Sequence, residues 1–184
     1  MQNLQQGEFQ VMSISNIDPV LRLVMTMKID CTSFETVGHM GKGVRRIMQL
    51  TGGTFEILAQ TGGTFSTPAV RGVVLGGYDW QILHSDSLAE LDVRYNLRTE
   101  RGDLIYVHAS GRRYASPEIL QKLMRGEPAE RGSHYYGAST PIIETGAPEL
   151  QWMNHHAFVG NSRSEPNAQH LRVFVVDYGS ASVR

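Results

Sequence analysis

The amino-acid sequence predicts a mainly β protein, an antiparallel β-barrel with one short α-helix. Apolar and polar residues alternate with a period of two over several segments, as in strands that have one dry face. Turns that contain glycine separate these segments, and a single segment has a clear helical pattern. Such a chain leaves little room for helical crossovers, and closure of its sheet would remove the exposed strand edges. An open sandwich is the alternative, because periodicity does not distinguish the two.

The clearest strand covers residues 88–98. In 21–29 the odd-numbered positions are likewise apolar, and most of their neighbours are polar. Segments 88–98 and 104–110 are joined by the short connection 99–103, which predicts an antiparallel hairpin. The apolar face of 88–98 is made by Ala89, Leu91, Val93, Tyr95 and Leu97. Further strands are expected at 70–75, 79–84, 142–145, 157–160 and 171–178, with glycine turns at 76–77, 101–103 and 146–148.

The helix is predicted directly after this hairpin. Ser116 can cap its N-terminus, Pro117 suits the first helical position, and Glu118 complements the positive end of the helix dipole. Gly126 can end the helix in a left-handed conformation. A second, short helical turn is expected at 150–154. The apolar face of the predicted helix is made by Ile119, Leu120, Leu123 and Met124.

The sequence Thr-Gly-Gly-Thr-Phe occurs at 51–55 and again at 61–65. A pair of copies is too few for a solenoid. A local duplication that lengthens one hairpin or loop is the simpler interpretation. The glycine-rich segment 38–43 superficially resembles a phosphate-binding loop, but it lacks the Gly-Lys-Ser/Thr ending, so we interpret it as a connection.

Composition places the chain among ordinary globular proteins. Its 184 residues suit one compact domain, which we assign to 1–184, with 1–18 as a flexible N-terminal segment. The formal net charge of -1 and the lack of a long basic run argue against a nucleic-acid partner. The polar start does not resemble a secretion signal, and no apolar run approaches the length of a membrane span. These observations favour a cytoplasmic protein without a membrane partner.

Several phrases occur in an order that resembles a known family. They include Arg-Gly-Val-Val-Leu-Gly-Gly at 71–77, Asp-Trp-Gln at 79–81, Leu-Asp-Val-Arg-Tyr at 91–95 and Val-Phe-Val-Val at 173–176. From about Leu21 to Tyr178 the chain resembles the family known as domain of unknown function 3237, or uncharacterised protein family 0311. The resemblance implies a β-barrel found in bacterial and fungal proteins, without an established general activity. Relative to that family, the second Thr-Gly-Gly-Thr-Phe copy looks like an insertion.

The first candidate site lies around one predicted hairpin, whose pairing would bring Asp79, Trp80, Asp92, Arg94 and Tyr95 near one another. In one interpretation, Asp92 and Arg94 lie on a solvated outer face with cross-strand ion pairs. In the other, they project into a wet barrel interior, where a desolvated carboxylate beside an arginine can bind an acidic or carbonyl substrate and move a proton. The second interpretation makes Asp79, Asp92 and Arg94 candidate catalytic residues. It makes Trp80 and Tyr95 candidate substrate-binding residues.

A second candidate group consists of Arg46, Glu144, Trp152 and Asn154. Glu144 is a candidate catalytic base, if a dry site raises its pKa. Arg46 offers a planar fork for a carboxylate or an enolate. Trp152 could form an apolar wall, and Asn154 could donate a hydrogen bond to a substrate oxygen. The alternative for this group is a satisfied buried network that fixes the end of the barrel.

Neither a metal nor a cofactor is expected. The seven histidines are scattered and form no His-x-His pair of the kind that barrel metalloenzymes use. Cys31 is the single cysteine, so it forms no intrachain disulfide, and no histidine partner for a nucleophilic thiol is identifiable. The sequence has no Gly-x-Ser-x-Gly elbow and no dinucleotide-binding fingerprint.

Two functional hypotheses remain. The first is a small-molecule-binding barrel that acts as a cofactor-independent isomerase, cyclase or lyase by proton transfer in its interior. The second is a non-catalytic ligand-binding or carrier barrel. In both, the partner is a small organic molecule. A homodimer is a further hypothesis, which rests on the edge segments and on the apolar stripe of 119–124.

Overall fold

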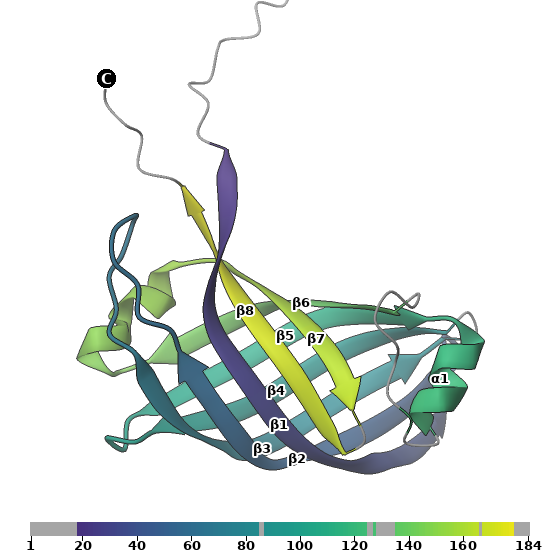
Figure 1. Ribbon diagram of the computed structural model, residues 1–184. Helices are drawn as coiled ribbons and strands as arrows, with labels where there is room; N and C mark the ends of the chain where they lie inside the picture. Colours follow the sequence, from purple (N-terminus) through teal and green to yellow (C-terminus); the bar gives the residue numbers. More distant parts are fainter. Residues whose placement is uncertain (1–17, 85–86, 125–126, 128–134, 166, 179–184) are drawn as a thin grey trace, which may run out of the picture.

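The computed structural model describes residues 18–84, 87–124, 127, 135–165 and 167–178. Its antiparallel strands close into a barrel in chain order, and β8 returns to pair with β1 (Figure 1). The predicted β-barrel is therefore confirmed, and the open sandwich is excluded. The strands are β1 (Pro19–His39), β2 (Val44–Ile57), β3 (Val70–Leu83), β4 (Leu88–Thr99), β5 (Leu104–Ala115), β6 (Tyr135–Thr145), β7 (Phe158–Glu165) and β8 (Ala168–Tyr178). Helix α1 (Pro117–Met124) follows β5, and the 3-10 helix η1 (Pro148–His155), which contains the predicted turn at 150–154, follows β6. Apart from Asp18, the segment 1–18 lies outside the described residues.

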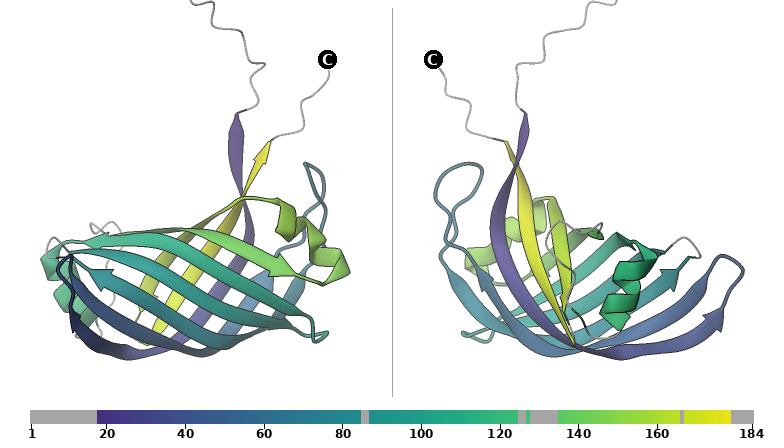
Figure 2. Two further views of the ribbon diagram at one scale, coloured as in Figure 1. Left: turned by 180° about the vertical axis from the view of Figure 1, so that it is seen from behind. Right: turned by 45° about the vertical axis from the view of Figure 1, so that its right-hand side comes forward.

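Alternation along each strand decides which side chains fill the barrel. In β4 the apolar face points inward, and Tyr95 and Leu97 are only 2% and 0% exposed. In β1 the alternate residues Met25, Met27 and Ile29 are likewise buried. The strands run obliquely around the barrel (Figure 2), as closure of a sheet requires. Local sequence periodicity therefore explains the dry inner face of β4 and of β1 from Met25 onward. Before Met25 the prediction is wrong: Leu21 is 58% exposed and Val24 is buried, because the β1–β8 register shifts between Leu23 and Met25.

Two strands differ from the prediction: β3 joins two predicted strands, and β2 is not among the predicted strands. β3 is continuous where the sequence predicts a turn at 76–77. A β-carbon at Gly77 would meet the backbone carbonyl oxygen of Arg94 and come within 2.7 Å of the Tyr95 Cα. β2 includes the first Thr-Gly-Gly-Thr-Phe copy, where Gly53 has a φ of 129° beside a register shift in its pairing with β1. These glycines allow close strand approach and a bulge instead of chain reversal.

Helix α1 begins where the sequence predicts. The Ser116 hydroxyl oxygen accepts a hydrogen bond from the backbone N–H of Ile119 at 3.4 Å. Ile119 packs against Ala115 and Tyr135, so the helix lies against one end of the barrel (Figure 2). Among the described residues, no helix has the length and apolar character needed to cross a bilayer. Outside the described residues lie the predicted stop, Gly126, and the side chains of Leu120, Leu123 and Met124.

An aromatic cluster closes the opposite end of the barrel. Phe65, from the second Thr-Gly-Gly-Thr-Phe copy, stacks on Trp152 of η1 with ring centroids 3.8 Å apart. The Arg22 guanidinium lies 4.4 Å from the Phe65 ring centroid and pairs with the buried Asp177 carboxylate at 2.9 Å. The Thr64 hydroxyl donates to the same carboxylate at 2.7 Å. The second repeat copy is therefore a loop that packs on the barrel end, whereas the first copy belongs to a strand.

Replacement of Gly77 by alanine tests the importance of the close approach between β3 and β4. Because the added β-carbon would overlap the backbone of β4, we expect Gly77→Ala to lower the free energy of unfolding by about 1–3 kcal/mol in urea titrations. Gly146→Ala is the matched control, since no neighbouring atom lies within 4 Å of its added β-carbon. Equal stability of the two variants would contradict this account of β3.

Candidate functional site

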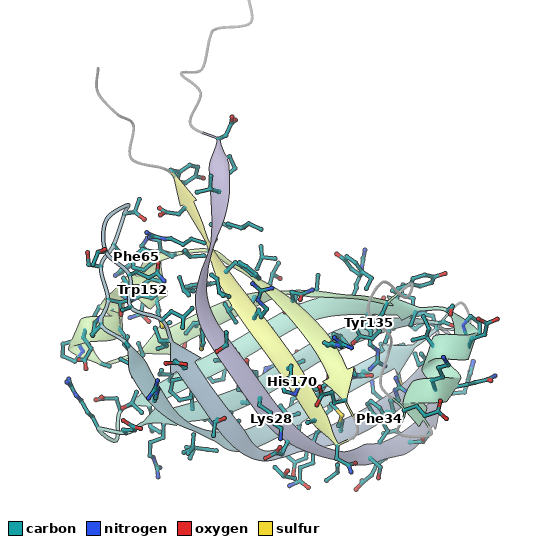
Figure 3. The ribbon with its side chains drawn as sticks, viewed as in Figure 1. Lys28, Phe34, Phe65, Tyr135, Trp152 and His170 are labelled. Carbon is teal, nitrogen blue, oxygen red and sulfur yellow. The ribbon has the colours of Figure 1, made fainter. Side chains whose placement is uncertain are left out.

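The barrel contains a partly open cavity of about 60 Å³ in the half nearer α1. This volume is enough for a few water molecules or a small organic group. Figure 3 shows Phe34 and Tyr135 at this end, and Phe65 and Trp152 at the other. Seven of the fifteen lining residues are apolar: Ile29, Met48, Leu50, Leu91, Val93, Ala109 and Leu171. The polar lining residues are Asp79, Gln81, Tyr95, Arg113, Tyr135, Ser139, Ser162 and Gln169.

Asp79 and Gln81 reach this cavity because they are alternate residues of β3. They are 4% and 1% exposed, respectively. Arg46 is paired with Gln81 in the β2–β3 register and therefore lies on the same inner face. Arg113 comes from β5 and is 8% exposed. Three strands thus place two guanidinium groups, one amide and one carboxyl group together.

The Gln81 amide links the charged groups. Its carbonyl oxygen accepts hydrogen bonds from Arg46 Nε and Nη2 at 3.2 and 3.0 Å, and from Arg113 Nη2 at 3.2 Å. Its amide nitrogen donates to Asp79 Oδ2. Each group therefore has at least one partner, although no direct ion pair joins either arginine to Asp79 in the described part of the chain.

Burial shifts the ionisation of these groups. It raises the pKa of Asp79 to about 6, although the Gln81 hydrogen bond and the charges of Arg113 and Arg46 act in the opposite direction. Burial and the nearby charge of Arg113 lower the pKa of Arg46 to about 10, so Arg46 stays protonated at neutral pH. Asp79 can therefore gain or lose its proton near neutral pH while positive charge remains beside it.

One hydrogen-bonded network thus joins Arg46, Asp79, Gln81 and Arg113. Two of its buried polar atoms lack a hydrogen-bond partner among the described residues. They are Asp79 Oδ1 and Arg113 Nε. Buried polar atoms are rarely left unpaired in folded proteins, and those that are often belong to sites that bind water or a ligand. One acceptor and one donor are thus available on side chains that line the cavity.

A wall of further polar side chains, from β6, β7 and β8, lies near the Gln81 network. The Tyr135 hydroxyl lies 3.0 Å from Ser164 Oγ, which donates to Gln169 Oε1 at 2.9 Å. Burial raises the pKa of the neighbouring Cys31 thiol, against the effect of its hydrogen bond with Gln169. This wall supplies hydroxyl and amide groups, and the Cys31 thiol of β1 lies beside it.

The structure places three of the predicted site residues on the inner face: Asp79, Arg46 and Tyr95. Tyr95 is 2% exposed, and its hydroxyl lies 3.8 Å from Met27 Sδ. Burial raises the pKa of Tyr95 far above its usual value, so its phenol is neutral. The functional roles of these residues remain predictions.

Asp92, Arg94 and Trp80 lie on the outer face, so their expected projection into a wet interior is wrong. The side chains of Asp92 and Arg94 are 45% and 42% exposed, and they pair with each other at 3.0 Å. His108 Nε2 lies 3.0 Å from the Asp92 carboxylate. The Arg94 guanidinium lies 5.7 Å from the Trp80 ring centroid. The physical reason is strand parity, because in β4 the apolar residues between them fill the barrel.

Glu144, Trp152 and Asn154 do not join Arg46 in one group. Glu144 is exposed on β6. Asn154 is also exposed, and its side chain exchanges hydrogen bonds of 2.9 Å with the backbone N–H and carbonyl of Thr145. Trp152 belongs to the aromatic cluster at the other end. The alternative interpretation, a satisfied buried network at the barrel end, fits only in part. Trp152 and Asn154 do lie at that end, but Asn154 is exposed, and the buried Trp152 Nε1 has no hydrogen-bond partner among the described residues.

Sequence reasoning missed Gln81, Arg113 and Tyr135. Arg113 follows the inward-facing residues Val107 and Ala109 of β5 in steps of two, so its parity already placed it on the buried face. An arginine at an apolar position of a strand is therefore the signal that could have found it. Among the described residues, no cluster of histidine, cysteine, aspartate and glutamate could hold a metal ion.

Comparison with known proteins assigns the family. The model of the family described as "Protein of unknown function (DUF3237)" matches residues 19–177. The chain belongs to this family. A UPF0311 protein of Rhodopseudomonas palustris is 33% identical over 157 residues, which cover 85% of this chain and 92% of that protein. The resemblance inferred from the sequence is thereby confirmed.

Solved structures share the barrel. A conserved protein of unknown function from R. palustris has a TM-score of 0.74 at 31% identity, covering 86% of this chain and 98% of that one. A β-barrel-like protein from Acinetobacter baumannii has a TM-score of 0.68 at 30% identity, covering 86% and 96%. An enzyme from Penicillium herquei has a TM-score of 0.57 at 18% identity, covering 85% and 94%, and this likeness shows the fold alone.

The raised pKa of Asp79 predicts a particular pH dependence of stability in this family member. Between its unperturbed value of 3.8 and about 6, the folded chain binds a proton that the unfolded chain releases, so stability falls as pH rises through this interval. The corresponding loss is about 3 kcal/mol between pH ~4 and ~7. We expect it in the difference between the unfolding free energies of the parent and Asp79→Asn, which cancels the other titrating groups. A pH-independent difference would contradict the proposed ionisation of Asp79.

Proposed function

We propose that the barrel binds a small organic molecule in its interior and acts on it as a cofactor-independent isomerase, cyclase or lyase, with Asp79 transferring the proton. One observation supports this most: a buried carboxyl group that lines a cavity and has a pKa of about 6. A general acid or base works best when its pKa lies near the working pH. The unpartnered Oδ1 of Asp79 is the atom available to a ligand.

In the proposed reaction, the Asp79 carboxylate takes a proton from a C–H or O–H group of the ligand. Negative charge then develops on a ligand oxygen, and the guanidinium of Arg113 stabilises it, supported by Arg46. Asp79 returns the proton to a different atom of the same molecule, which balances an isomerisation or a cyclisation. For a lyase, the proton goes to the group that leaves.

The surroundings of Asp79 suit such chemistry. The apolar lining, with residues such as Leu91, Val93 and Leu171, lowers the local polarity and strengthens interactions between charges. The barrel walls hold Asp79 and Arg113 in place before a ligand arrives, because both are buried within strands. A protein of the same fold is described as an enzyme, which is compatible with catalysis in a barrel of this kind.

A non-catalytic carrier is the second candidate, and the seven apolar residues of the cavity lining favour it. In a carrier, burial of an apolar ligand body would supply most of the binding energy. Replacement of Asp79 would then leave ligand binding largely intact. The two candidates therefore differ in their dependence on one carboxyl group.

Solvent exchange of carbon-bound hydrogen can test proton transfer without knowledge of the natural substrate. We expect the parent protein to accelerate deuterium incorporation from D₂O into members of a panel of small ketones and 1,3-dicarbonyl compounds, followed by NMR. Asp79→Asn should lower that rate about 100-fold or more, because the proton acceptor is lost. Asp30→Asn is the matched control, since this side chain is 52% exposed on β1.

Retention of the parent exchange rate by a folded Asp79→Asn protein would overturn the catalytic proposal. If the panel shows no exchange, and if Asp79→Asn binds the same compounds as the parent does, the carrier is the correct interpretation. Far-ultraviolet circular dichroism of each variant checks that the barrel is intact.

A further inference from the structure

The charges around the cavity do not balance. Among the described residues, the groups that face Asp79 are Arg46 from β2, Arg113 from β5, Cys31 from β1, Tyr95 from β4 and Tyr135 from β6. The thiol and the Tyr95 phenol stay neutral near neutral pH, because burial raises the pKa of each. Two cations, Arg46 and Arg113, therefore lie near a single carboxyl group, and that carboxyl group is itself partly protonated.

Of these two cations, Arg113 has the less complete hydrogen bonding. It is 8% exposed, its Nη2 donates to Gln81, and its Nε has no acceptor among the described residues. A buried guanidinium normally pairs with an anion, because desolvation of an unpaired charge is costly. Asp79 does not fill this role, since its carboxyl group is bonded to the Gln81 amide.

The aromatic ring of Phe34 supports both guanidinium groups. The ring centroid lies 3.9 Å from the Arg46 guanidinium carbon and 5.9 Å from that of Arg113. Cation–π contact of this kind partly offsets desolvation, but a ring carries no negative charge that could neutralise a cation. Phe34 therefore fixes the two cations in place and leaves their charge available to a ligand.

We infer that the cavity takes a small organic anion, with a carboxylate or enolate oxygen on Arg113 and an apolar body against Leu91, Val93 and Leu171. This inference rests on the proposed function only in so far as the ligand occupies the same cavity. Binding of an anion beside Asp79 favours the protonated form of that carboxyl group, since two negative charges at close range repel each other. Anion binding is thus accompanied by proton uptake on Asp79.

Sulfonates are suitable probes, because they stay ionised throughout the accessible pH range. We expect methanesulfonate to bind at least about tenfold more tightly than neutral methanesulfonamide, which has the same shape, as measured by calorimetry and NMR titration. Arg113→Gln should weaken sulfonate binding about 10- to 100-fold. Arg71→Gln is the control, because its side chain is 68% exposed on the outer face and should leave binding unchanged.

Proton linkage gives an independent readout. Sulfonate affinity should fall as pH rises through about 6. Calorimetry in buffers of different ionisation enthalpy should show uptake of a fraction of a proton per bound sulfonate near neutral pH. Both effects should be lost in Asp79→Asn.

Equal affinity for sulfonate and sulfonamide, or binding of neither, would overturn the inference, and this comparison needs only the parent protein. Unchanged sulfonate affinity in a folded Arg113→Gln protein would overturn it as well. The outcome is separable from that of the proposed function. Binding of neutral ligands together with Asp79-dependent deuterium exchange would end the inference and leave the catalytic proposal standing. Sulfonate binding without any deuterium exchange would end the catalytic proposal and leave the inference standing.

Discussion

The chemistry available inside this barrel depends on the side chain of Gln81. Its amide accepts hydrogen bonds from Arg46 and Arg113 and donates one to Asp79, so that it separates the positive groups from the carboxyl group. A direct ion pair would keep Asp79 ionised and would occupy a guanidinium. The intervening amide instead leaves the carboxyl group able to exchange a proton near neutral pH. It also leaves a guanidinium N–H free for another acceptor.

Closure of the sheet determines which charged residues belong to this network. Asp79 and Asp92 lie on neighbouring strands, yet one carboxyl group is buried in the lumen and the other is half-exposed beside His108 and Arg94. Adjacent residues of a strand point to opposite faces, so a small step along the chain separates a buried group from a solvated one. In water, the Asp92–Arg94 pair contributes little to stability, whereas burial changes the ionisation of Asp79.

The two ends of the barrel differ in the side chains that fill them. At the η1 end, Phe65 and Trp152 stack and close the core, with Arg22 and Asp177 holding the loop in place. Toward α1, polar side chains face the cavity, and the packing is incomplete. The second Thr-Gly-Gly-Thr-Phe copy lies at the closed end. It therefore lies away from the cavity and adds to the packing there.

The sequence by itself determined the strands with regular alternation, the hairpin of β4 and β5, the start of α1 and the inward position of Tyr95, because each of these depends on neighbours within one segment. It did not determine that Arg46, Gln81 and Arg113 meet. These residues come from three different strands, and a polar residue at an inward position looks locally like a break in the pattern. Only the tertiary structure brings these three side chains together. Distances across a lumen depend on strand register and on closure of the sheet, and local periodicity encodes neither.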